Sequence, residues 1–138
     1  MTTIATDGKF MVGDGQSTRN DSVTGSSSRK VVRLPDGSIV AGAGRRTDVE
    51  RAINALQTEA EVRAPGDYAL LRLYPTGKLE LYESGLDTPI RVKPPQALGT
   101  GADAAMGAML AGLDAYEAVK IASKIDIYTG GKITSFSI

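Results

Sequence analysis

Residues 1–18 read MTTIATDGKFMVGDGQST, and the first hairpin of the fold can be predicted from them. Two short runs, 3–6 and 9–12, flank the pair Asp7-Gly8. Both positions of a two-residue hairpin turn favour positive φ, which Asp-Gly adopts readily. We therefore expect antiparallel strands over residues 3–12. The threonines behind Met1, and the aspartate between Gly13 and Gly15, need an explanation from the rest of the chain.

The remaining patterns alternate between hairpins and helices. We expect further hairpins over 30–41, 68–83 and 125–138, an extended piece over 89–93, and a polar surface loop over 13–29. Helices are predicted over 49–62, capped by Asp48 or Thr47, then in a small-residue stretch after Thr100, and over 114–124. A capping box at Asp114 and Glu117 starts the last helix.

Blocks of strands separated from blocks of helices indicate an α+β fold in one domain, residues 1–138. There are too many strands for one sheet, so we expect two antiparallel sheets packed face to face with helices outside. This is a four-layer αββα sandwich.

Composition excludes several kinds of chemistry. The 138 residues include no histidine and no cysteine, which rules out a Ser-His-Asp triad, a Cys-His dyad, a disulfide and a conventional zinc site. A base would have to be a carboxylate, a lysine or the α-amine, whose ordinary pKa of about 8 lies nearest neutrality. Lys plus Arg equals Asp plus Glu at 16 each, so we expect no nucleic-acid partner. No long apolar run or signal peptide is apparent, and we expect a cytoplasmic protein without membrane contact.

Five blocks, in order, resemble the bacterial proteasome-like peptidase HslV (ClpQ), of the proteasome β-subunit branch of the N-terminal nucleophile hydrolases. They are TTIATDGKFMVGDGQST, SRKVVRL, IVAGAG, ALGTGADAA and KIDIYTGG. The resemblance implies a threonine peptidase in which Thr2 becomes the N-terminal nucleophile when Met1 is removed, with its own α-amine as base. It implies that Lys30 lies beside the nucleophile and that Asp14 pairs with Lys30.

Other site residues follow from the same resemblance. The segment Gly42 to Gly44 matches the backbone of the oxyanion hole, with Gly44 and Ala43 both candidates for the donor. Thr100 stands where the family has a serine that supports the terminal amine, although a turn residue would serve there too. Ser123, Asp126 and Thr129 match a loop whose carbonyls hold a monovalent cation, Na⁺ or K⁺, and no other cofactor is expected for the chemistry.

The chain departs from the family between the oxyanion segment and residue 65, where one helix replaces two long ones. In the family this region contributes to ring contacts and to docking of the ATPase. A homo-oligomer acting on peptides or unfolded proteins is expected, as a hexameric ring, a smaller ring or a dimer, with a chain that acts alone as the alternative. An HslU-type AAA+ unfoldase could be present or absent. Arg45-Arg46 would favour acidic residues in the peptide. The alternatives are a catalytically silent structural subunit that retains Met1, and an unrelated α+β binding domain.

Overall fold

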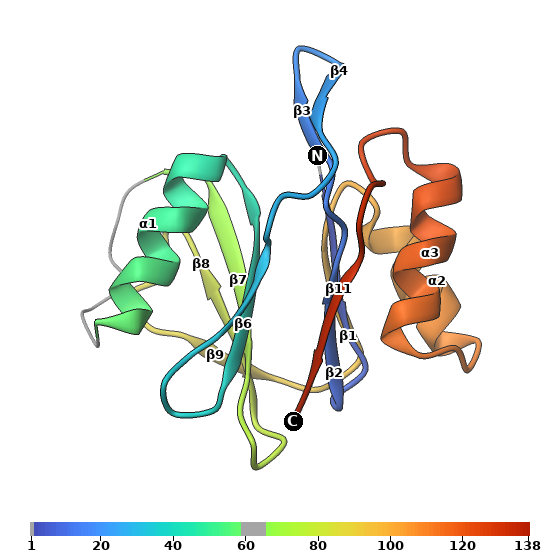
Figure 1. Ribbon diagram of the computed structural model, residues 1–138. Coiled ribbons are helices and arrows are strands. Elements are labelled where there is room, and N and C mark those ends of the chain that lie inside the picture. Colours follow the sequence, from blue (N-terminus) through green and yellow to red (C-terminus); the bar gives the residue numbers. More distant parts are fainter. Residues whose placement is uncertain (1, 59–65) are drawn as a thin grey trace.

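The computed structural model describes residues 2–58 and 66–138, which form four layers (Figure 1). One helix covers the outer face of a five-stranded sheet, a four-stranded sheet packs behind it, and two helices cover the far face. The expected αββα sandwich of two antiparallel sheets is confirmed.

The four-stranded sheet has the order β10-β1-β2-β11 and the five-stranded sheet the order β5-β6-β7-β8-β9. All pairs are antiparallel. The strands of the first sheet are β1 (Thr3–Thr6), β2 (Phe10–Gly13), β10 (Gln96–Gly99) and β11 (Thr134–Ser137). Those of the second are β5 (Val31–Arg33), β6 (Ile39–Gly44), β7 (Tyr68–Leu73), β8 (Leu79–Glu83) and β9 (Ile90–Val92).

Alternation along the strands divides the buried side chains into three clusters, because successive residues point to opposite faces of a sheet. In β1, Ile4 packs between the two sheets, whereas Ala5 faces the helices. In β6, Ile39 and Ala41 join the cluster between the sheets, and Val40 packs toward the outer helix. The two sheets are thereby held together over an apolar interior.

The three helices lie on the outer faces of the sandwich (Figure 1). Helix α1 (Arg46–Gln57) buries Ala52, Ile53 and Leu56 against β6 and β7. Helices α2 (Ala102–Leu110) and α3 (Ala115–Ile125) pack on each other and on β1. Asp114 caps α3 by accepting the Glu117 N–H at 2.8 Å, which confirms the N-cap half of the predicted capping box.

The predicted helix over 49–62 begins earlier than expected. Arg45, rather than Asp48 or Thr47, is the N-cap, and it has no side-chain cap bond. The carboxylate of Asp48 instead accepts the N–H of Asp67 at 3.1 Å, so that it ties the helix to the start of β7. The predicted end at residue 62 lies outside the described residues.

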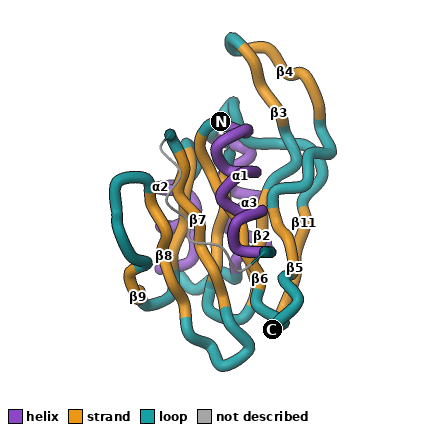
Figure 2. The backbone as a smooth tube through the Cα atoms, turned by 90° about the vertical axis from the view of Figure 1, so that its left-hand side faces the viewer, coloured by secondary structure: helices purple, strands orange, loops and turns teal. Residues whose placement is uncertain are grey.

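Two expectations about loops were wrong. Residues 13–29 contain a hairpin, β3 (Ser17–Arg19) and β4 (Ser22–Gly25), which projects beyond the sheets in Figure 2. Its turn is formed by Asn20 and Asp21 with φ of 50° and 63°, a conformation these residue types tolerate. Residues 125–128 form no strand, because α3 continues to Ile125, and β11 pairs with β2 instead. No helix in the described residues is long and apolar enough to cross a membrane.

Candidate active site

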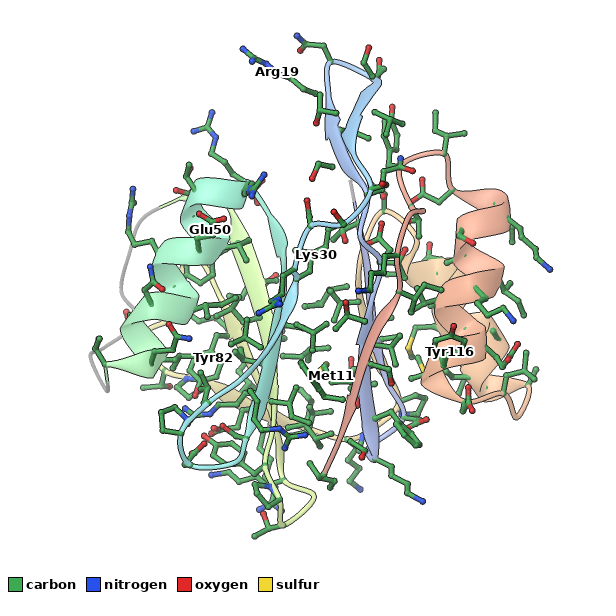
Figure 3. The ribbon with its side chains drawn as sticks, in the orientation of Figure 1. Met11, Arg19, Lys30, Glu50, Tyr82 and Tyr116 are labelled. Atoms are coloured by element: carbon green, nitrogen blue, oxygen red, sulfur yellow. The ribbon has the colours of Figure 1, made fainter. Side chains whose placement is uncertain are left out.

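The side chains of Thr2, Asp14 and Lys30 meet at one end of the sandwich. Lys30 Nζ donates to Thr2 Oγ at 2.6 Å and to Asp14 Oδ1 at 2.8 Å, and Thr2 Oγ donates to the same Asp14 oxygen. In Figure 3, Lys30 lies between the two sheets, toward the end that carries the β3–β4 hairpin and away from Met11. Three residues that the sequence separates by up to 28 positions thus form one connected group.

The Asp14 carboxylate organises this group because it accepts hydrogen bonds from several directions. Besides Thr2 and Lys30, it accepts the N–H groups of Thr3 at 3.1 Å, Gly130 at 3.1 Å and Gln16 at 3.4 Å. Its residue is 1% exposed. A buried carboxylate held by so many donors stays where it is, and it therefore fixes the ammonium that pairs with it.

Lys30 is a largely buried cation that pairs with one carboxylate, that of Asp14. Its side chain is 14% exposed and that of Asp14 is fully buried. Burial lowers the pKa of Lys30 below its ordinary value, although the charge and the hydrogen bond of Asp14 act in the opposite direction. An ammonium in contact with Thr2 Oγ favours the ionised form of that hydroxyl, which makes the oxygen a better nucleophile.

The oxyanion candidates Ala43 and Gly44 differ in the direction of their N–H groups. Arg45 donates its N–H to the carbonyl of Asp67 at 2.8 Å, so these two residues form a hydrogen-bonded pair of the β6–β7 ladder. Hydrogen-bonded and non-hydrogen-bonded pairs alternate in an antiparallel ladder. The pair of Gly44 with Tyr68 is therefore of the second kind, and the N–H of Gly44 points away from β7.

That N–H faces the side on which β5 runs, but β5 pairs with β6 only from Ile39 to Ala41. The N–H of Gly44 thus points past the start of β5, where Lys30 lies. Ala43 pairs with Ala69 and directs its N–H into the ladder. The geometry favours Gly44 over Ala43. Gly44 has a φ of +133°, and a Cβ there would lie 2.4 Å from the Asp67 carbonyl oxygen, which explains the glycine.

A pocket of about 390 Å³ opens beside Thr2 and Lys30. Its wall between β6 and α1 is formed by Gly42, Ala43, Gly44, Val49 and Ile53. Charged side chains also line it: Arg29, Arg45, Arg46, Glu50 and Asp67. Arg46 pairs with Glu50 at 3.1 Å, whereas the described residues contain no ion pair of Arg29 or Arg45. The pocket therefore combines an apolar wall with an excess of positive charge.

Thr100 lies on the other side of Thr2. Its hydroxyl donates to Asp126 Oδ2 at 2.5 Å, and its oxygen lies 3.4 Å from the carbonyl oxygen of Thr2. Asp126 Oδ2 also accepts the hydroxyl of Thr129 at 2.6 Å, and the hydroxyls of Thr129 and Thr3 are 2.7 Å apart. Burial raises the pKa of Asp126, but the bonds from Thr100, Thr129 and an amide outweigh it, so the pKa is lowered. Hydrogen bonds through Thr129 and Asp126 thus link Thr3, the residue after Thr2, to the C-terminal end of α3.

The residues expected to hold a monovalent cation are brought only partly together. Asp126 and Thr129 face each other in one turn, in which the N–H of Thr129 donates to the Asp126 carbonyl at 3.1 Å. Ser123 lies inside α3, and its hydroxyl donates to the Lys120 carbonyl at 2.6 Å. Because the side chains of the three residues are already paired, only backbone carbonyls could bind an ion. Such neutral, hard oxygen donors suit Na⁺ or K⁺, and in the described residues no group of acidic side chains could hold a metal.

Two contributors to this site could not be recognised from residue types alone. Gln16 accepts a hydrogen bond from Lys30 Nζ at 2.7 Å, but through its backbone carbonyl, which leaves no mark in the sequence. Asp126 was expected to act through its carbonyl, whereas its side chain holds Thr100 and Thr129.

Comparison of the sequence alone finds no matching family model and no similar curated protein. Solved structures do match. Eukaryotic HslV from Trypanosoma brucei has a TM-score of 0.76 at 20% identity, with 99% of this chain and 100% of that chain covered. BPH from Thiobacillus denitrificans in complex with epoxomicin has a TM-score of 0.75 at 18% identity, with 99% and 97% covered. A further structure of BPH has a TM-score of 0.70 at 18% identity, with 99% and 96% covered.

These likenesses confirm the fold that the sequence blocks implied. The chain has the same four-layer αββα fold as these structures, and it is similar in fold, over nearly its whole length, to HslV and to BPH. The resemblance to HslV is thereby confirmed at the level of the fold.

Proposed function

We propose that the chain is the peptidase subunit of a proteasome-like protease in which Thr2, after removal of Met1, is the nucleophile. The observation that carries this proposal is the contact of Thr2 Oγ with Lys30 Nζ at 2.6 Å, beside a pocket. The absence of histidine and cysteine from the sequence supports a base of another kind, and the α-amine of Thr2 meets that need.

The reaction follows from this arrangement. Thr2 Oγ attacks the scissile carbonyl carbon while its proton passes to the α-amine, directly or through one water. The N–H of Gly44 stabilises the oxyanion, a contribution typically worth about 3 kcal/mol. The intermediate then releases the amine product, which takes the proton, and leaves an ester on Thr2. Water hydrolyses that ester by the same route.

The positive charge around the pocket supports a preference for acidic residues in the peptide, because Arg45 directly follows the oxyanion donor. The P1 side chain starts one bond away from the carbonyl held at Gly44, and it therefore lies close to Arg45. We further propose a homo-oligomer, with or without an HslU-type unfoldase, cytoplasmic residence, and Na⁺ or K⁺ on the carbonyls of Ser123, Asp126 and Thr129.

The test uses an epoxyketone such as epoxomicin, which reacts with an N-terminal threonine. Purified protein should form a covalent adduct on Thr2 and cleave short fluorogenic peptides. Thr2→Ala should do neither. Thr24→Ala makes the same chemical change on the exposed strand β4 and should leave both activities intact. Cleavage that survives in Thr2→Ala would refute the mechanism, and retention of Met1 without an adduct would support the silent structural subunit.

A further inference from the structure

Gln16 contacts both members of the Lys30–Asp14 pair through its backbone. Its carbonyl accepts from Lys30 Nζ at 2.7 Å, and its N–H donates to Asp14 Oδ2 at 3.4 Å. The Lys30 ammonium thus has three acceptors: this carbonyl, Asp14 Oδ1 and Thr2 Oγ. Three acceptors determine the position of an ammonium, because each takes one of its three protons.

The side chain of Gln16 points in another direction and attaches to the loop after α3. Its Nε2 donates to the carbonyl of Ile127 at 2.9 Å, and the residue is 9% exposed. The side chain of Ile127 is 75% exposed, so that the carbonyl, rather than apolar packing, makes this connection. On the same loop, a Cβ at Gly130 would lie 2.5 Å from Gln16 Oε1, so the backbone passes close to this amide and a side chain there would displace it.

We infer that Gln16 is a positioning residue: its side-chain amide, anchored on the Ile127 carbonyl, holds its own backbone carbonyl in place as the third acceptor of the Lys30 ammonium. The inference rests on the proposed function for its consequence in catalysis. Its structural part stands on the three hydrogen bonds of Gln16. Without the anchor, the Gln16 carbonyl loses one of the bonds that fix its position, and Lys30 Nζ then moves relative to Thr2 Oγ.

The substitution that tests this is Gln16→Met, which keeps the length of the side chain and removes its donor. Gln96→Met is the matched control. Gln96 lies on β10, away from Lys30, and its Nε2 also donates to a backbone carbonyl, that of Lys93, at 2.9 Å. Both variants leave every charged group in place: Asp14 against Lys30, and around the pocket Arg29, Arg45, Arg46, Glu50 and Asp67.

The first readout is the titration of Lys30, followed by NMR of ¹³C-labelled lysine and assigned with Lys30→Arg. An acceptor stabilises the ammonium, so its displacement should lower the pKa of Lys30 in Gln16→Met and leave it unchanged in Gln96→Met. This readout needs no turnover. An unchanged Lys30 titration in a folded Gln16→Met protein would overturn the inference.

The second readout is the pH dependence of peptide cleavage. In Gln16→Met we expect kcat to fall about tenfold, the effect of roughly one lost hydrogen bond, with KM unchanged. The acid limb should move to higher pH, because a displaced Lys30 charge no longer lowers the pKa of the Thr2 amine. If the substitution only reduced the fraction of active protein, kcat would fall but the acid limb of the pH profile would stay in place. If only KM rose, Gln16 would be contacting the substrate. Either result would overturn the inference.

A second variant approaches the same contact from the loop. Gly130→Ala places a methyl group against Gln16 Oε1 and should lower kcat in the same way. In a Gln16→Ala background this methyl group meets no amide, so its effect should be much smaller; equal effects in both backgrounds would contradict the inference. If Lys30 titrates as expected but the unmodified protein cleaves no peptide, the positioning role stands and the proposed function fails.

Discussion

Substitution of Asp14 by asparagine should destabilise the protein more than any surface charge change. Asparagine keeps the shape but leaves the Lys30 ammonium, whose side chain is only 14% exposed, without its counter-ion. Loss of one member of a buried pair typically costs 3–5 kcal/mol, and the partial exposure of Lys30 favours the lower end, about 3 kcal/mol. Turnover should be lost as well, because Asp14 also holds Thr2 Oγ.

Urea denaturation of four proteins measures this effect: the unmodified chain, Asp14→Asn, Lys30→Met and the double variant. Each single variant leaves one uncompensated buried group, whereas the double variant leaves none. The double variant should therefore be clearly more stable than the sum of the single changes predicts. Glu50→Gln is the control, since its pair with Arg46 is 74% and 60% exposed and its loss should change stability by less than about 1 kcal/mol. Strict additivity, or an Asp14→Asn effect no larger than that of the control, would refute a coupled buried pair.

Three further substitutions test other parts of the account. Burial raises the pKa of Asp7, but amide bonds, including one from Ala115 at 2.9 Å, outweigh it and lower the pKa. Asp7→Ala should therefore cost about 1–2 kcal/mol in thermal or urea unfolding, a difference fully present above the ordinary pKa of 3.8 and lost as pH falls through the lower folded value. Gly44→Ala should lower the free energy of unfolding by on the order of 1–3 kcal/mol, because Gly44 has a φ of +133° and a Cβ there would meet the Asp67 carbonyl. It should also reduce kcat. Gly107→Ala is the control and should not destabilise α2, because the space around its Cβ is open. Arg45→Glu should reduce cleavage after glutamate relative to leucine in a fluorogenic peptide panel, and an unchanged ratio would exclude Arg45 from specificity.

Local signals predicted the hairpins over 3–12, 30–41 and 68–83 and the last helix well. Asp7-Gly8 and Asp36-Gly37 mark turns that the structure contains, with Gly8 and Gly37 at φ of 94° and 87°. The capping box at Asp114 marks the start of α3. Each of these signals lies within a few residues, so that tertiary contacts do not alter it.

Other features depended on contacts between distant segments. The N-terminus of α1 is set by the hydrogen bond from the Arg45 N–H to the Asp67 carbonyl. Asp48 is a good N-cap residue by type, but its carboxylate accepts the Asp67 N–H instead of capping the helix. Likewise, β11 pairs with β2 and not with the residues before Gly130, which no local pattern indicates. The meeting of Thr2, Asp14 and Lys30 was expected from the family resemblance alone. Composition only required a base other than histidine.

The most direct test of the central proposal is the intact mass of the purified chain, measured before and after incubation with an epoxyketone. Loss of Met1, followed by one inhibitor adduct that Thr2→Ala does not form, is the result that an N-terminal threonine peptidase predicts. A chain that retains Met1 and forms no adduct under conditions in which it is folded would contradict it.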